Sequence, residues 1–129
     1  MPPLPQLLHD PTHRTLWRAL LLVLLAVVSV AALAPGTEAP SLGIGDKVDH
    51  LLAFVSLTVA ATMSWPATRG HAALAGAGLL AYGAFIEVAQ TQVPGRYGDV
   101  VDVAVDAAGI VAGLALAMGL RSRWPPSPA

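Results

Sequence analysis

The sequence predicts an all-α fold: an integral membrane four-helix bundle with both termini in the cytoplasm. The first observation is composition, since 55% of the 129 residues are hydrophobic and only 12% are charged, whereas a soluble domain is about 25% charged. The second is that four apolar runs follow one another with short loops between them, rich in proline, glycine and serine. The third is the placement of lysine and arginine, considered below. We expect a single domain over residues 1–129.

The first predicted span covers residues 17–34, which are apolar from Ala19 onward apart from Ser29. Residues 1–16 are polar and contain prolines, and we expect a short exposed tail there. A cleaved signal peptide is the alternative, because arginines precede this run and Ala32-Leu33-Ala34 resembles a cleavage site. The long tail and the proline directly after Ala34 argue against cleavage.

The second predicted span covers residues 46–65, because a helix that starts at Asp46 has about 20 residues and crosses about 30 Å. Its apolar part alone, from Leu51 to Trp65, would be too short. Asp46, Lys47 and His50 should therefore lie in the mouth of the membrane, on one helix face. Asp49 points elsewhere at 100° per residue, and Asp46 as a helix N-cap is the alternative reading of that residue.

The third and fourth spans, residues 72–91 and 99–120, form a hairpin turned at Pro94 and Gly95. Polar residues and glycines share one stripe on each helix, and small residues allow close helix packing in a membrane. The acids should therefore face protein rather than lipid. The G-x-x-x-G spacing of Gly109 and Gly113 would also suit a homo-oligomer. The two stripes are Gly76, Gly83, Glu87 and Gln90 on one helix, and Asp99, Asp102, Asp106, Gly109 and Gly113 on the other.

Topology follows from the excess of Lys and Arg in cytoplasmic flanks. Five arginines, Arg14, Arg18, Arg69, Arg121 and Arg123, lie on the side of the two tails, against Lys47 and Arg96 on the other. The polar mouth should therefore open to the extracytoplasmic side.

We expect residues 121–129, basic and then proline-rich, to be disordered. With a net charge of −1 and no basic cluster, we predict no nucleic-acid partner. The absence of cysteine excludes disulfides and thiolate metal sites.

Three segments bring polar residues to the outer mouth, and intramembrane acids are functional candidates by default. Six acids there, including Asp49 and the helix-start residue Asp99, face only two cations, so protonation, a cationic histidine, or a metal or cationic ligand must make up the difference. Arg96 either clamps these acids or reads a phosphate. The candidate site residues are Asp46, Lys47, His50, Glu87, Gln90, Arg96, Asp102 and Asp106.

A metal ligand set of His50 with Asp46, Glu87 or Asp102 is chemically reasonable. One histidine among carboxylates is a weak signal, however, and we predict no metal site. No cofactor is indicated by the sequence.

The ordered motifs Asp46-Lys47-x-x-His50, Glu87-x-x-Gln90 and Pro94-Gly95-Arg96, followed by Asp102 and Gly109, resemble the VanZ-like family of small bacterial membrane proteins. The resemblance covers residues 44–115. It implies a multi-pass protein of the bacterial inner membrane, whose namesake lowers susceptibility to the glycopeptide teicoplanin. The chain departs from the family at Asp106, where asparagine is common.

Three functions fit these residues. The first is binding of an envelope lipid or a lipid-linked precursor by its headgroup in the outer polar pocket, which would contribute to glycopeptide resistance; membrane lipids or such a precursor would then be the partners. The second is a hydrolase or transferase acting on a lipid phosphate or ester, with Glu87 or Asp102 as base, although no nucleophile paired with a base stands out and no catalytic residue is assigned. The third is a small ion-coupled transporter.

Overall fold

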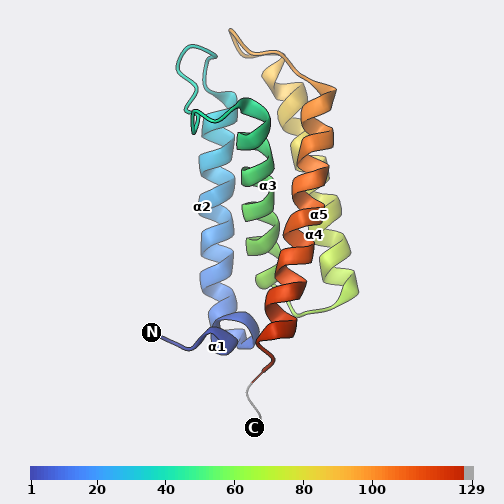
Figure 1. Ribbon diagram of the computed structural model, residues 1–129. Coiled ribbons are helices and arrows are strands. Elements are labelled where there is room, and N and C mark those ends of the chain that lie inside the picture. The colour runs from blue at the N-terminus through green and yellow to red at the C-terminus, as the bar shows by residue number, and fades with distance from the viewer. Residues whose placement is uncertain (127–129) are drawn as a thin grey trace.

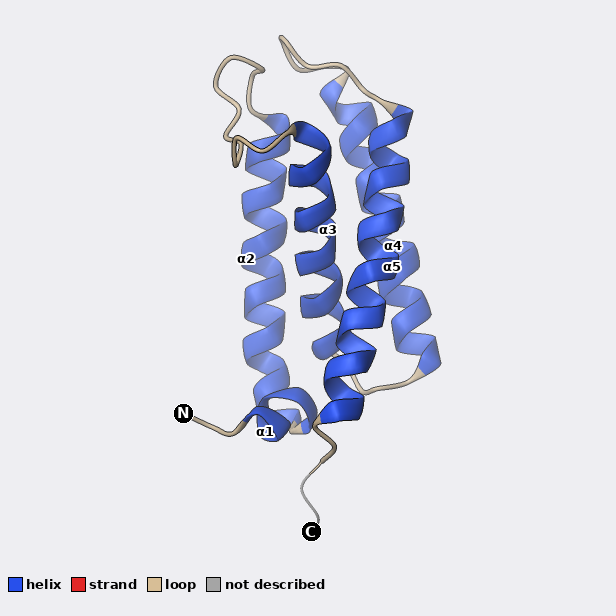
Figure 2. Ribbon diagram, viewed as in Figure 1, coloured by secondary structure: helices blue, strands red, loops and turns tan. Residues whose placement is uncertain are grey.

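The structure, a computed structural model, describes residues 1–126 and contains helices but no strand within them. The elements are α1 (Leu4–His9), the 3₁₀ turn η1 (Pro11–His13), α2 (Arg14–Leu33), α3 (Asp46–Met63), α4 (Arg69–Gln90) and α5 (Val100–Arg123). The four long helices α2 to α5 run side by side, and helix α1 and the carboxyl end of α5 lie at the same end of the molecule (Figure 1). Loops join the helices only at the two ends (Figure 2).

Three stretches of the described chain are long and apolar enough to cross a membrane: Pro11–Leu33, Arg69–Gln90 and Val100–Arg123. Helix α3 is not among them, because it has 18 residues and carries Asp46, Lys47 and Asp49 in its first turn. The all-helical prediction is therefore confirmed, with three candidate spans in place of the four expected.

Helix α3 is nevertheless the most enclosed helix, and its main neighbour is α5. A Cβ placed on Gly109 would lie 2.9 Å from the Leu51 carbonyl oxygen, and one on Gly113 would lie 2.6 Å from Thr58 Cβ. The missing side chains thus let the two backbones come close, as in small-residue membrane interfaces. The predicted packing face of α5 is confirmed. Because α3 covers it within the same chain, a homo-oligomer would have to use another surface.

The amino-terminal segment differs from the exposed tail that we expected. Residues Leu4–His9 form a helix, and Leu8 is buried against Met63 and Ala117. The Trp17 indole donates a hydrogen bond to the Leu7 carbonyl oxygen at 2.8 Å. Most of residues 1–16 are exposed, as expected, but the helix and the burial of Leu8 were not predicted, because the apolar side of so short a helix is hidden among prolines and polar residues. At the other terminus α5 extends to Arg123, past the predicted end of the fourth span, while residues 127–129 of the expected disordered tail lie outside the described residues.

Two arginines donate hydrogen bonds to the free carbonyl oxygens at the carboxyl end of α3. Arg18 donates to the Ser64 carbonyl oxygen at 3.2 Å and lies 4.4 Å from the centre of the Trp65 indole. Arg121 donates to the Thr62 and Trp65 carbonyl oxygens. Positive charge is favourable at a helix carboxyl end, where carbonyl groups lack intrahelical partners. These contacts hold α2 and α5 against the carboxyl end of α3.

Candidate functional site

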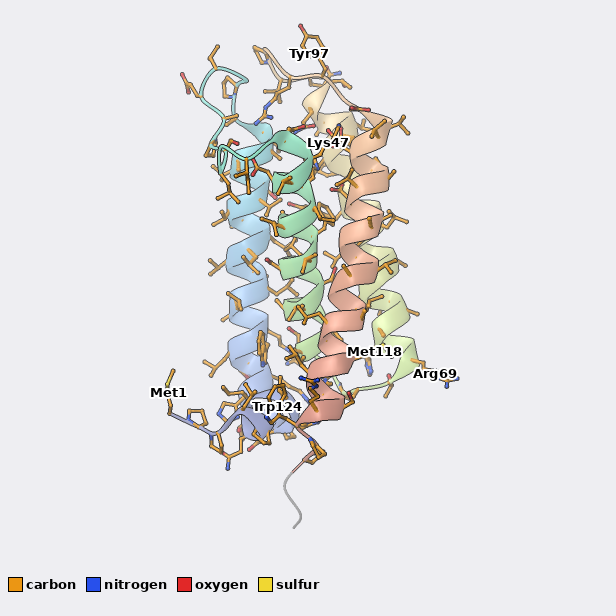
Figure 3. All side chains as sticks on the ribbon, in the orientation of Figure 1. Met1, Lys47, Arg69, Tyr97, Met118 and Trp124 are labelled. Carbon is orange, nitrogen blue, oxygen red and sulfur yellow. The ribbon has the colours of Figure 1, made fainter. Side chains whose placement is uncertain are left out.

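The other end of the molecule holds a group of charged side chains between α3, α4 and α5. Lys47 and Tyr97 lie at this end, opposite Arg69 and Trp124 (Figure 3). We call this group the acid cluster. Its members are Lys47, His50, Glu87, Asp99, Asp102 and Asp106.

Lys47 links the outer part of the acid cluster. Its ammonium donates to Asp99 Oδ2 at 2.8 Å and also to Asp102 Oδ1. Asp99 is the N-cap of α5 and accepts from the Val101 N–H at 2.8 Å, as an aspartate at that position commonly does. The Lys47 ammonium holds the pKa of Asp99 below its usual range. Both sides of this ion pair remain about half exposed.

His50 joins the two aspartates of α5. Its Nδ1 lies 2.9 Å from Asp106 Oδ1, and its Nε2 lies 3.6 Å from Asp102 Oδ2. Asp106 is 1% exposed and Asp102 is 4% exposed, so both carboxyl groups are removed from solvent. The predicted face of α3 therefore delivers Lys47 and His50 to the acids of α5, as the sequence indicated.

Glu87 reaches the acid cluster from α4. Its Oε2 accepts from the Asp99 N–H at 2.8 Å, so Glu87 also satisfies the amino end of α5. The donor atoms of His50, Glu87 and Asp106 all lie within 4.8 Å of one another, and the same holds for Asp46, His50 and Asp102. Glu87 of α4 and Asp106 of α5 therefore lie close together in the structure.

Two carboxylate oxygens in the acid cluster have no hydrogen-bond partner among the described residues. These are Glu87 Oε1 and Asp106 Oδ2, both buried. Most buried polar atoms in proteins are hydrogen-bonded, and an unmatched buried acceptor costs about 1–3 kcal/mol. Gly83 provides the room for Asp106, because a Cβ there would lie 2.6 Å from Asp106 Oδ2.

Gln90 and Arg96 do not join the acid cluster. Gln90 Nε2 donates to the Ala32 carbonyl oxygen at 3.0 Å. Arg96 donates to the carbonyl oxygens of Ala31 and Ala34 at 2.7 and 3.0 Å. Both residues bind the carboxyl end of α2, and among the described residues Arg96 contacts no carboxylate of the acid cluster. The sequence could not reveal this, because the acceptors are backbone atoms about 60 residues away.

Asp46 and Asp49 lie at the edge of the site. The helix N-cap is Gly45, without a side-chain cap, so the N-cap reading of Asp46 is wrong; Asp46 occupies the first turn and is exposed. Asp49 points away from the acid cluster, as predicted, and its carboxylate accepts from the Ser41 hydroxyl at 2.5 Å. Asp49 thereby orders the loop before α3.

A shallow apolar groove adjoins the acid cluster. It has a volume of about 410 Å³ and runs between α3 and α5, with Lys47 at one end. Ligand pockets in proteins usually measure about 300–1,000 Å³. This groove was not predicted from the sequence, because it depends on small side chains of α5 that face α3. Its lining residues are Lys47, Val48 and Leu51 from α3 and Val101, Ala104, Val105 and Ala108 from α5.

Three hydroxyl groups that could in principle act as nucleophiles lie outside the acid cluster. Ser56 donates to the Leu52 carbonyl oxygen at 2.8 Å, and Thr91 donates to the Val88 carbonyl oxygen at 2.7 Å. Thr58 is buried against Gly113 on the α3–α5 interface. None of these three hydroxyls is paired with a carboxylate of the acid cluster, so the geometry adds no support to nucleophilic catalysis by serine or threonine.

Comparison with known proteins assigns the chain to a family. No curated protein and no solved structure matches it significantly. The VanZ/LLP1 family model matches residues 6–121, which include every residue of the acid cluster and of the groove. The motif resemblance seen in the sequence is thus confirmed over most of the chain. With its three apolar helices, the chain belongs to the VanZ/LLP1 family and is a VanZ-like membrane protein.

Proposed function

We propose that this protein binds an envelope lipid or a lipid-linked precursor at the extracytoplasmic side of the bacterial inner membrane. The observation that carries the proposal is the apolar groove between α3 and α5, which ends at Lys47 and the acid cluster. A hydrocarbon chain suits the valine and alanine side chains of the groove, and a polar headgroup suits its charged end.

The charges favour a particular kind of headgroup contact. Lys47 already contacts Asp99 and Asp102, and Arg96 is engaged by α2. An anionic phosphate alone would therefore meet carboxylates as well as Lys47. A headgroup that also carries an ammonium group, or that binds through a cation, fits the excess of acids better.

The proposed topology has four spans, with α3 enclosed by the other helices, and both termini in the cytoplasm. Five arginines near the helix ends on the side of the termini support it; they are Arg14, Arg18, Arg69, Arg121 and Arg123. The hydrogen bonds from Gln90 and Arg96 to the end of α2 support retention of the first span rather than its removal as a signal peptide.

Topology can be tested directly, because the natural chain has no cysteine. Tyr97→Cys and Ser122→Cys place single thiols at exposed positions at opposite ends of the molecule. In spheroplasts, a membrane-impermeant maleimide should label Tyr97→Cys and should label Ser122→Cys only after lysis. The reverse pattern would contradict the proposed orientation.

Lipid binding can be tested by filling the groove. Ala104→Leu adds apolar volume to the groove, and Ala84→Leu makes the same change at an exposed position of α4. Protein purified in mild detergent is extracted and its lipids are identified by mass spectrometry. Wild type and Ala84→Leu should retain a specific lipid that Ala104→Leu loses. Equal retention in all three proteins would exclude the groove as the binding site.

We propose that lipid binding contributes to teicoplanin resistance by altering access of the glycopeptide to its target. Expression of the wild type in a teicoplanin-sensitive bacterium should raise the inhibitory concentration, and Ala84→Leu should act like the wild type. Ala104→Leu, at equal membrane abundance, should lose the effect. Full resistance with an empty groove would separate resistance from lipid binding.

A further inference from the structure

The inner part of the acid cluster contains acceptors that nothing in the described chain satisfies. Glu87 is 6% exposed and Asp106 is 1% exposed, and each has one oxygen without a hydrogen-bond partner in residues 1–126. Each of these carboxylates uses its other oxygen, for the Asp99 N–H and for His50 respectively. The two free oxygens therefore require an additional donor or a cation.

The excess of carboxylates in the acid cluster also favours a bound cation. Besides Glu87 and Asp106, the buried Asp102 and the half-exposed Asp99 lie in the acid cluster. Lys47 contacts only the two outer carboxylates, Asp99 and Asp102, which leaves His50 as the single group that can offset the inner pair. Buried carboxylates without enough positive charge are costly, and a bound cation removes that cost.

We infer that His50, Glu87 and Asp106 form a binding site for a divalent transition-metal ion such as Zn²⁺ or Mn²⁺. Their donor atoms lie within 4.8 Å of one another, and bonds of about 2.1 Å at the tetrahedral angle separate two ligand atoms by about 3.4 Å. The 2.9 Å between His50 Nδ1 and Asp106 Oδ1 is shorter than this, so a bound zinc ion would move these two atoms slightly apart.

The residues around this set are arranged to orient it. When Nδ1 of His50 binds the metal, Nε2 faces Asp102 Oδ2 at 3.6 Å, and a carboxylate is the usual partner of the second nitrogen of a ligating histidine. Lys47 in turn holds Asp102, and the Asp99 N–H holds Glu87. Two of the three proposed ligands, His50 and Glu87, thus have a neighbour outside the metal site, while Asp106 contacts His50.

The choice of metal follows from the ligands. One imidazole nitrogen and carboxylate oxygens suit zinc and manganese, whereas calcium prefers oxygen ligands alone. The chain has no cysteine, so soft thiolate-dependent ions are not selected. The second group of donors, Asp46, His50 and Asp102, is less suitable, because Asp46 is exposed and Asp102 is already bound by Lys47.

The inference stands apart from the proposed lipid function, because a metal can bind here whether or not the groove holds a lipid. Ala104→Leu should therefore leave metal affinity unchanged while it removes the lipid. Unchanged metal affinity in Glu87→Gln would refute the metal site and leave the lipid proposal standing. Lipid retention in Ala104→Leu would refute the groove and leave the metal site standing.

Titration calorimetry of the full chain in mild detergent, after treatment with a chelator, tests the site with Zn²⁺ and with Mn²⁺ alone. The wild type should bind one ion, and Asp106→Asn and Glu87→Gln should each bind it at least about tenfold more weakly. Asp49→Asn, which removes a carboxylate of α3 outside the site, should bind like the wild type.

Several results would overturn the inference. They are absence of saturable binding by the wild type, wild-type affinity in both site variants, and a loss in Asp46→Asn without a loss in Glu87→Gln, which would indicate the outer group of donors. If the site variants do not fold, Co²⁺ absorption of the wild type decides. A spectrum with nitrogen and oxygen ligation that Zn²⁺ displaces supports the site, and the spectrum of the hydrated ion refutes it.

Discussion

The polar mouth of the protein has two sides that the sequence presents as one site. On the α2 side, Gln90 and Arg96 donate to the last carbonyl oxygens of α2, and the Gly36 N–H donates to the Pro94 carbonyl oxygen at 3.1 Å. On the α3–α5 side, oxygens of Glu87 and Asp106 have no hydrogen-bond partner within residues 1–126. The α2 side thus holds the helices together through satisfied hydrogen bonds, whereas the acid cluster retains the free acceptors that we propose a ligand satisfies.

The largest expected effect comes from disrupting the close packing of α3 against α5, on which both sides depend. A side chain on Gly113 would collide with Thr58 and with the Val55 carbonyl oxygen, so Gly113→Leu must push α3 away from α5. We expect a loss of about 3 kcal/mol in unfolding free energy, measured by titration with a denaturing detergent. Gly119→Leu on the same helix meets open space and should be close to neutral. Equal stability of the two variants would contradict the close α3–α5 packing.

The next effect concerns the α2 side alone. Arg96→Gln removes the hydrogen bonds to Ala31 and Ala34 and should lower the unfolding free energy by about 1–3 kcal/mol. Zn²⁺ affinity and lipid retention of the folded variant should not change. A variant of wild-type stability that has lost its ligands would show that Arg96 acts in the site rather than in the scaffold.

A smaller effect probes the acid cluster through its neighbour. In Gly83→Ala the new Cβ would lie 2.6 Å from Asp106 Oδ2 and 3.1 Å from the Phe54 ring, so the carboxylate must move. Zn²⁺ affinity measured by calorimetry should fall by about tenfold, with a loss of stability of about 1 kcal/mol. Gly78→Ala, at an open position of α4, is the control and should bind normally. Normal binding in Gly83→Ala would place the metal away from Asp106.

The smallest expected effect concerns Asp10, whose carboxylate accepts a hydrogen bond from the Thr12 N–H. It is the reference for Glu87 and Asp106, which each have an oxygen without a partner in the described residues. The Thr12 N–H lowers the pKa of Asp10 from 3.8. Because the pKa of Asp10 is lower in the folded state, its carboxylate contributes to stability above about pH 4. That contribution is lost as the pH falls through the pKa of the folded state. The difference in melting temperature between wild type and Asp10→Asn should therefore shrink below about pH 4. A difference that grows at low pH would have the wrong sign.

Features that depend on local periodicity could be predicted from the sequence. The 100° rotation per residue placed Glu87, Asp102 and Asp106 on buried faces, and all three are buried. Asp99 was expected near a helix start and is the N-cap of α5. The sequence analysis did not include Asp99 among the site residues, although its position three residues before Asp102 was the available signal.

Features that depend on contacts between distant segments could not be predicted. Gln90 and Arg96 looked like site residues because polar groups in an apolar sequence suggest function, but their partners are backbone carbonyls of α2. The pairing of the Ser29 and Tyr82 hydroxyls at 2.7 Å between α2 and α4 is another such case. Sequence periodicity assigns a residue to a face but does not identify the helix that covers it.

Native mass spectrometry of the protein in mild detergent tests the central claim, that the acid cluster is a ligand site and the α2 side is structural. The wild type and Arg96→Gln should carry a bound lipid and one metal ion, and the Glu87→Gln, Asp102→Asn double variant should lose the metal ion and hold the lipid less well. A wild type that carries neither ligand, with a double variant that differs only in stability, would contradict the account and show that the acids are structural.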